Sequence, residues 1–209
     1  DEVVTGFRWS VGGVQLIEGV MPDITALAKV LAGGFPGGAV AGRRDLMERL
    51  EFPAPGVKAD KIGHPGTFNA NPLSSAAGVA CLREIADGTH QGAADARAKE
   101  LRAGMNTVLA ELGMRGAIYG ESSVFKILLG VDCEPLATDR HGLDLPPALL
   151  ERGTPSEVSR QMQLSLLNRG VFFFGNAGIV SSAHTSADIA HTIDSWRSAL
   201  QELRAEGIL

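Results

Sequence analysis

The sequence has little cysteine and no long apolar run. Its two cysteines, Cys81 and Cys133, both lie in apolar stretches. They are too few for a disulfide framework or a paired-thiol metal site, and such sparse use of cysteine is typical of the reducing cytoplasm. No apolar stretch approaches the roughly 20 residues that a transmembrane helix requires, and no segment has the pattern of a signal peptide. We therefore expect a cytoplasmic, globular protein without a membrane partner.

The sequence also lacks a concentration of positive charge. The formal net charge is −5, and no group of lysines or arginines stands apart from the acidic residues. Such a chain has no general attraction for nucleic acid, so no nucleic-acid partner is expected. The five histidines are scattered, without carboxylates or thiols at metal-ligand spacing. We therefore predict no metal site, and we interpret His64 as a loop or interface residue and His184 as a structural hydrogen-bonding residue.

Hydrophobic periodicity and breaker residues predict an α/β first half and an α+β second half. The opening stretch contains a short apolar, β-branched run, Val3-Val4, and ends in a Thr-Gly pair, which predicts the end of a buried strand with Asp1 at the carboxyl end of that strand. Residues 24–29 lie between a Pro-Asp pair and a Gly-Gly pair, which predicts a short helical turn capped by Asp23. Further strands are predicted at residues 37–42 (buried), 117–119, 125–131, 171–174 and 179–182. Helices are predicted at residues 44–50, 72–85, 93–112, 156–168 and 186–205. A proline-containing loop is predicted at residues 135–147.

The long, half-exposed helix around residues 90–113 is the most natural domain boundary. We predict an α/β portion at residues 1–100 and a smaller α+β domain at residues 101–209. The sequence begins at Asp1 without an initiator Met and without a preceding helix cap or turn. This beginning is typical of a chain cut within a domain, so we expect the sequence to be part of a longer polypeptide.

Lys29 is the main candidate for a reactive side chain. Its sequence neighbours Leu27, Ala28, Val30 and Leu31 are all apolar. Partial desolvation disfavours the ammonium form of a lysine and leaves an amine that can attack a carbonyl, which is the requirement for a Schiff base. A solvated helix residue is the alternative interpretation, and the surrounding motifs favour the reactive one.

Several segments resemble the class III aminotransferase signature in their order and spacing. They are Asp1-Glu2-Val3-Val4-Thr5-Gly6-Phe7-Arg8, Pro22-Asp23, Lys29, Gly33-Gly34-Phe35-Pro36-Gly37-Gly38-Ala39, Gly42-Arg43-Arg44 and Gly66-Thr67-Phe68-Asn69-Ala70-Asn71-Pro72-Leu73. A weaker similarity near Gly170-Val171 and Ser181-Ser182-Ala183-His184 extends the resemblance nearly to the end of the sequence. The resemblance, which includes glutamate-1-semialdehyde aminomutases, implies the C-terminal part of a fold-type I pyridoxal phosphate-dependent transferase. Residues 1–100 would then belong to its large α/β domain and residues 101–209 would form its small C-terminal α+β domain.

The resemblance assigns roles to two residues of the reaction centre. Asp1 would pair with the pyridine nitrogen of pyridoxal phosphate and keep it protonated, so that the ring can accept electrons from the substrate α carbon. Lys29 would hold the cofactor as a Schiff base and, after displacement by the substrate amine, move the proton between the α carbon and the cofactor.

A second site segment is implied at Gly66 and Thr67. Their backbone amides and the Thr67 hydroxyl are adequate donors for a phosphate. In the resembling family this threonine reaches the cofactor of the neighbouring subunit, which implies a homodimer with shared active sites. The partners are then a small-molecule amino donor and amino acceptor.

The activity is left between two hypotheses. The first is that the parent polypeptide is a transaminase or aminomutase acting on an amino acid or an amino-aldehyde. The segment Gly175-Asn176-Ala177-Gly178 is shorter than its aminomutase counterpart, which makes the broader transaminase assignment the more secure of the two. The second hypothesis is that the 209-residue chain is a catalytically silent fragment or subunit that needs an N-terminal partner, since the resemblance covers only the second half of such an enzyme.

Overall fold

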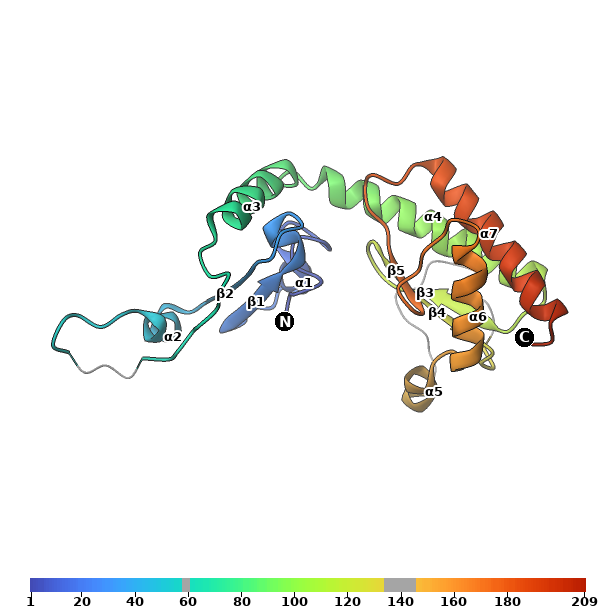
Figure 1. The fold of residues 1–209 in the computed structure, drawn as a ribbon, viewed down its shortest axis with the longest axis horizontal. Coiled ribbons are helices and arrows are strands. Elements are labelled where there is room, and N and C mark those ends of the chain that lie inside the picture. The colour runs from blue at the N-terminus through green and yellow to red at the C-terminus, as the bar shows by residue number, and fades with distance from the viewer. Residues whose placement is uncertain (58–60, 134–145) are drawn as a thin grey trace. The chain divides into compact units, whose positions relative to one another are not determined.

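The computed structural model describes residues 1–57, 61–133 and 146–209 (Figure 1). These residues fall into two compact units, Asp1–Thr89 and His90–Leu209. Most of the predicted loop at 135–147 lies outside the described residues. The predicted domain division after residue 100 stays a prediction, because the two units are defined by contacts within this chain alone.

The first unit contains one antiparallel hairpin and several short helices. In the hairpin, Ile24 pairs with Gly42 and Ala28 with Gly38, while an isolated parallel bridge joins Glu2 to strand β1. The elements in chain order are α1 (Gly13–Ile17), β1 (Ile24–Ala28), the 3-10 helix η1 (Lys29–Ala32), β2 (Gly38–Gly42), α2 (Arg44–Met47), the 3-10 helix η2 (Glu48–Leu50) and α3 (Pro72–Glu84).

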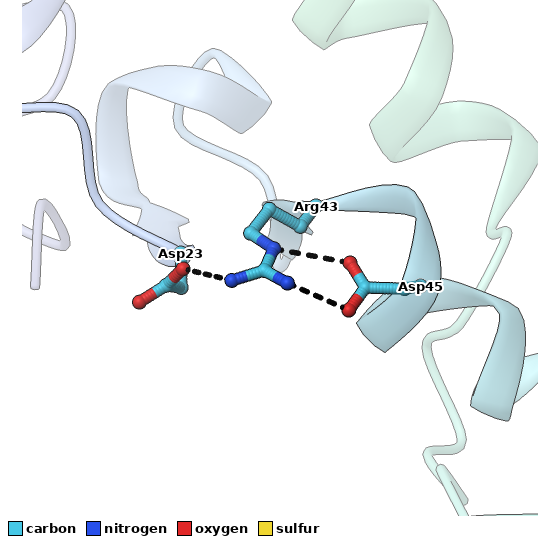
Figure 2. A network of polar contacts seen from close by, with 3 residues as sticks. All are labelled: Asp23, Arg43 and Asp45. Carbon is cyan, nitrogen blue, oxygen red and sulfur yellow. Dashed lines mark hydrogen bonds and ion pairs between the residues drawn. The ribbon is translucent and has the colours of Figure 1, made fainter.

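The predicted helical turn at residues 24–29 is wrong, because Ile24–Ala28 forms strand β1. Figure 2 shows the Asp23 carboxylate beside Arg43, which donates to Asp23 Oδ1 at 2.8 Å and to both carboxylate oxygens of Asp45. The backbone amide of Arg43 also donates to the Asp23 carbonyl at 2.9 Å, so these contacts close the open end of the hairpin. Pairing with β2, which is distant in sequence, therefore outweighs the local helix signal.

Strand β2 forms as predicted, but it is not buried. All five of its residues are exposed, since β1 is its only strand partner among the described residues. The described part of the first unit has a single fully buried hydrophobic side chain, that of Ala32. Close backbone packing takes the place of an apolar core: a Cβ at Gly78 would lie 2.6 Å from the Leu31 carbonyl, and one at Gly33 would lie 2.8 Å from the Ala77 carbonyl. These glycines let α3 pack directly on η1.

The second unit is an α+β arrangement around one apolar core. Its described strands form an antiparallel sheet in the order β3-β4-β5 (Figure 1). The core is centred on Trp196, Met105, Phe125 and Leu166, contributed by helices and sheet together. The elements are α4 (Thr89–Glu111), β3 (Gly116–Tyr119), β4 (Val124–Leu129), α5 (Pro147–Arg152), α6 (Ser156–Leu167), β5 (Ala177–Ile179) and α7 (Ser186–Ala205).

The predicted strands near the end of the chain are partly wrong. In the segment 171–174, only Phe174 forms a bridge, to Ala177, although Val171 and Phe173 are buried as in a strand. The third strand of the sheet is β5, which begins two residues before the predicted 179–182. A Cβ at Gly178 would lie 2.2 Å from the Phe125 ring, so the glycine lets this segment, rather than residues 171–174, pair with β4.

Helix starts that carry side-chain caps are confirmed. Asn71 Oδ1 accepts from the backbone amides of Leu73 and Ser74 at 3.0 and 3.1 Å, with Pro72 in the first turn of α3. In α7, Thr185 Oγ1 accepts from the Asp188 amide at 3.3 Å, and Asp188 Oδ2 accepts from the Thr185 amide at 2.7 Å. These contacts satisfy amides that have no partner within their own helix.

Helix length and polarity bear on membrane association. Across residues 1–57, 61–133 and 146–209, no helix combines the length and the apolar character needed to cross a lipid bilayer.

Removal of the α7 cap tests the energetic role of the capping box. We expect Thr185→Ala to lower the free energy of unfolding of the second unit by about 1 kcal/mol, because the Asp188 amide loses its acceptor. Ser198→Ala on the same helix is the control, since the Ser198 hydroxyl only donates to the Asp194 carbonyl one turn earlier. Urea denaturation followed by circular dichroism measures both variants. Equal stability of the two would show that the box contributes nothing.

Candidate active site

Lys29 lies at a strained point of the backbone. It follows β1 directly, begins η1, and has a φ of +52°, in the left-handed region that a lysine seldom adopts. The Ala28–Gly38 pair holds the chain before Lys29, and Gly33, whose amide donates to the Val30 carbonyl at 3.1 Å, holds it after η1. Strain of this kind persists only where the surrounding structure imposes it, and it is frequent at functional sites.

The expected desolvation of Lys29 by its neighbours is wrong for the described structure. The Lys29 side chain is exposed, Val30 and Leu31 are half-buried, and Ala32 is buried. In a 3-10 helix, successive residues point about 120° apart, so apolar sequence neighbours need not surround the lysine. Its amine has no hydrogen-bond or ion-pair partner among the described residues. The Lys29 side chain is therefore accessible from solvent.

The predicted end of a buried strand at the first residues is wrong: Glu2 alone bridges to β1, residues 3–5 form a turn, and the local β-branched signal is not matched by a continuous strand partner. The Glu2 amide donates to the Ala26 carbonyl at 2.9 Å, and Glu2 forms a parallel bridge with Leu27. Asp1 is exposed, and its Oδ1 accepts from the Val3 amide at 2.7 Å. The structure thus brings the segments of Asp1 and Lys29 side by side, although the two residues are far apart in the sequence.

Glu2 is a buried carboxylate that the sequence analysis did not single out. Its side chain accepts from the Gln15 amide at 2.7 Å and from the Thr5 hydroxyl. Burial raises the pKa of Glu2. Hydrogen bonds from Thr5, Gln15 and Val14 lower the pKa by more than burial raises it, so the net pKa lies below its ordinary value. Its position directly after the candidate Asp1 was the only sequence signal that pointed to it.

Gly66 and Thr67 belong to an exposed turn before α3. The Asn69 amide donates to the Gly66 carbonyl at 3.1 Å, and Asn69 Nδ2 donates to the His64 carbonyl at 2.9 Å. A Cβ at Gly66 would lie 2.5 Å from Asn69 Oδ1, so a larger residue would require the Asn69 side chain to shift. Thr67 is exposed at the turn. Asn69, which closes the turn, was part of the motif but was not predicted as a site residue.

A cavity of about 510 Å³ lies in the first unit between η1, β2 and α3. Neither Lys29, Asp1 nor Thr67 lines it, so the cavity adjoins the candidate residues without containing them. Its lining comprises small, apolar and amide residues together with one imidazole: Leu31, Ala32, Pro36, Gly37, Gly38, His64, Phe68, Asn69, Ala70, Asn71, Ser74, Ser75, Gly78, Val79 and Leu82.

The structure also bears on metal binding. Within the part of the chain that the structure describes, no group of three His, Cys, Asp or Glu side chains is placed to hold a metal ion.

Comparison with known proteins gives the family of the chain. The family model of class III aminotransferases matches residues 1–138. A glutamate-1-semialdehyde 2,1-aminomutase of Akkermansia muciniphila is 31% identical over 206 residues, which cover 97% of this chain and 44% of that protein. The chain therefore spans less than half the length of the curated relatives it matches.

Solved structures agree with this match. An omega-transaminase from Sphaerobacter thermophilus superposes with a TM-score of 0.80 at 30% identity, covering 98% of this chain and 44% of that one. A transaminase with pyridoxal phosphate bound superposes with a TM-score of 0.78 at 26% identity, covering 100% of this chain and 45% of that one. The predicted fold, part of a fold-type I transferase, is thereby confirmed. The chain belongs to the class III aminotransferase family.

Proposed function

We propose that the full protein carrying this chain is a pyridoxal phosphate-dependent aminotransferase or aminomutase that acts on an amino acid or an amino-aldehyde. The observation that supports the proposal is the pairing of Glu2 with β1: the exposed Asp1 carboxylate and the Lys29 amine, which has no partner among the described residues, lie on neighbouring segments. The family match makes this cofactor the expected one, and the pair of groups fits its chemistry, since the cofactor requires an amine for attachment and an acid at its ring nitrogen.

Each residue then has a defined task. Pyridoxal phosphate, when bound, withdraws electrons from the substrate α carbon. The Asp1 carboxylate holds a proton on the pyridine nitrogen, and Lys29 Nζ attaches the cofactor and later moves a proton at the substrate α carbon. The small-molecule amino donor and acceptor enter the same site in turn.

We also propose that the site is shared between two subunits. The Thr67 hydroxyl and the Gly66 backbone would hold the phosphate of the cofactor in the neighbouring subunit, which fits the exposure of their turn. The first unit exposes large apolar side chains, among them Leu16, Met21 and Phe35. Exposed apolar side chains of this kind are typical of a surface that packs against further protein, and a second subunit would supply part of that cover.

Chemical labelling tests the assignment of Lys29. Borohydride reduction of the full-length protein should fix a phosphopyridoxyl group on Lys29, because no described residue pairs with its amine. The remaining lysines, Lys58, Lys61, Lys99 and Lys126, serve as internal controls in the same peptide map. A label on any of these in place of Lys29 would overturn the assignment.

Asp1→Asn tests the ring-nitrogen acid. The variant should keep the cofactor on Lys29 but lose about 100-fold or more in kcat, because a neutral amide cannot hold the pyridinium proton by an ion pair. Asp23→Asn is the matched control, since Asp23 is an exposed acid of the same unit that pairs with Arg43. Steady-state amino-transfer kinetics compare the two, and normal turnover in Asp1→Asn would remove Asp1 from the mechanism.

Mixed dimers test the shared site. Thr67→Val should weaken cofactor affinity on the order of tenfold or more, because a hydrogen bond to a charged phosphate is lost. Thr67→Val and Lys29→Ala subunits, each poorly active alone, should regain activity when refolded together, since one site of the hybrid then combines an intact Lys29 with an intact Thr67. A mixture no more active than its components would show that each subunit works alone.

A further inference from the structure

The Glu2 side chain is buried, and neutral hydrogen-bond donors rather than basic side chains surround its carboxylate in the described chain. Only 5% of Glu2 is exposed, yet its carboxylate touches no lysine or arginine among its hydrogen-bond partners in the described chain. Its partners are the Thr5 hydroxyl and the backbone amides of Gln15 and Val14 at the start of α1. An apolar side chain of similar size would avoid this desolvation, so the carboxylate must serve a purpose other than filling space.

The surroundings of Glu2 are shaped to receive it. Gly13 has a φ of +74°, and a Cβ on it would lie 2.7 Å from both carboxylate oxygens of Glu2. Gly6 donates its amide to the Glu2 carbonyl at 2.9 Å, and a Cβ on Gly6 would lie 2.7 Å from that same oxygen. The Glu2 side chain therefore requires a glycine at position 13, and the Glu2 backbone requires a glycine at position 6.

The contacts of Glu2 form a closed ring that includes β1. Glu2 Oε1 accepts from the Gln15 amide, and Gln15 Oε1 accepts from the Thr25 hydroxyl at 2.9 Å. Thr25 lies on β1, and the neighbouring Ala26 carbonyl accepts from the Glu2 amide at 2.9 Å, which closes the ring. Two members of this ring connect directly to the candidate residues: Glu2 follows Asp1 in the sequence, and β1 is followed by Lys29.

We propose that Glu2 is a positioning residue, whose buried carboxylate fixes the Asp1 carboxylate in relation to Lys29 through the Gln15–Thr25 ring. This role rests on the function proposed above. Glu2 touches neither cofactor nor substrate in this scheme. It holds the first residues of the chain, including Asp1, against the strand that leads to Lys29, so its loss lets Asp1 move away from the ring nitrogen while the cofactor stays on Lys29.

Kinetics and cofactor absorbance of the full-length protein test this role. Glu2→Ala should lower kcat by about 100-fold with little change in the KM of the amino donor, because a displaced acid costs turnover rather than substrate binding. Glu2→Gln keeps one oxygen for the Gln15 amide and should lose less. In both variants, the pH dependence of cofactor absorbance should shift in the same direction as in Asp1→Asn.

A matched pair of glycine variants separates positioning from general destabilisation. Gly13→Ala pushes a Cβ into the Glu2 carboxylate and should reproduce the kinetic and spectral changes of Glu2→Gln. Gly19→Ala is the control, because Gly19 has a similar φ of +64° with no atom within 4 Å of an added Cβ. It should lose stability in thermal melts but keep the kcat and the absorbance titration of the parent.

A double variant decides whether Glu2 acts through Asp1. Asp1→Asn combined with Glu2→Ala should be no slower than Asp1→Asn alone, since the acid that Glu2 positions is already lost. Additive losses, or an unshifted absorbance titration in folded Glu2→Gln and Gly13→Ala, would overturn the positioning role while leaving the proposed function intact. An unlabelled Lys29 in the parent protein would instead overturn the proposed function, and this role with it.

Discussion

The candidate site depends on one short stretch of parallel pairing between the first residues and β1. Glu2 makes the bridge to Leu27 and donates its amide to the Ala26 carbonyl. Through this contact, the segment with the candidate acid and the strand that ends at the candidate lysine run side by side. The hairpin partner β2 and the Gly33 turn then hold Lys29 in its unusual backbone conformation.

The two units are stabilised by different forces. The second unit encloses a core of helix and sheet side chains around Trp196 and Phe125, so hydrophobic burial stabilises it. The first unit has almost no such core among its described residues and relies on hydrogen-bonded turns and on close packing of glycines. Elements held in this way tolerate a polar site, because the backbone there is fixed by directional contacts. They also leave large apolar side chains exposed.

Prediction from sequence succeeded where the signal was local. Helix α3 begins after Asn71 and α7 after Thr185, as their capping residues indicated. It failed where a distant segment decided the outcome. Residues 24–29 carry a helix signal but pair with β2, and residues 171–174 alternate like a strand while Gly178 allows the following segment to take the place beside β4. Strand pairing depends on partners that local patterns do not reveal.

The sequence by itself determined the family, because its motifs occur in an order and spacing that the class III model also matches. It also determined which lysine is the candidate for the cofactor. Only the tertiary structure decided that Lys29 is exposed at a positive φ, and that Glu2 is buried in a ring of contacts with Gln15 and Thr25. Motifs record which residues are present, whereas exposure and hydrogen bonding arise from segments that meet only when the chain folds.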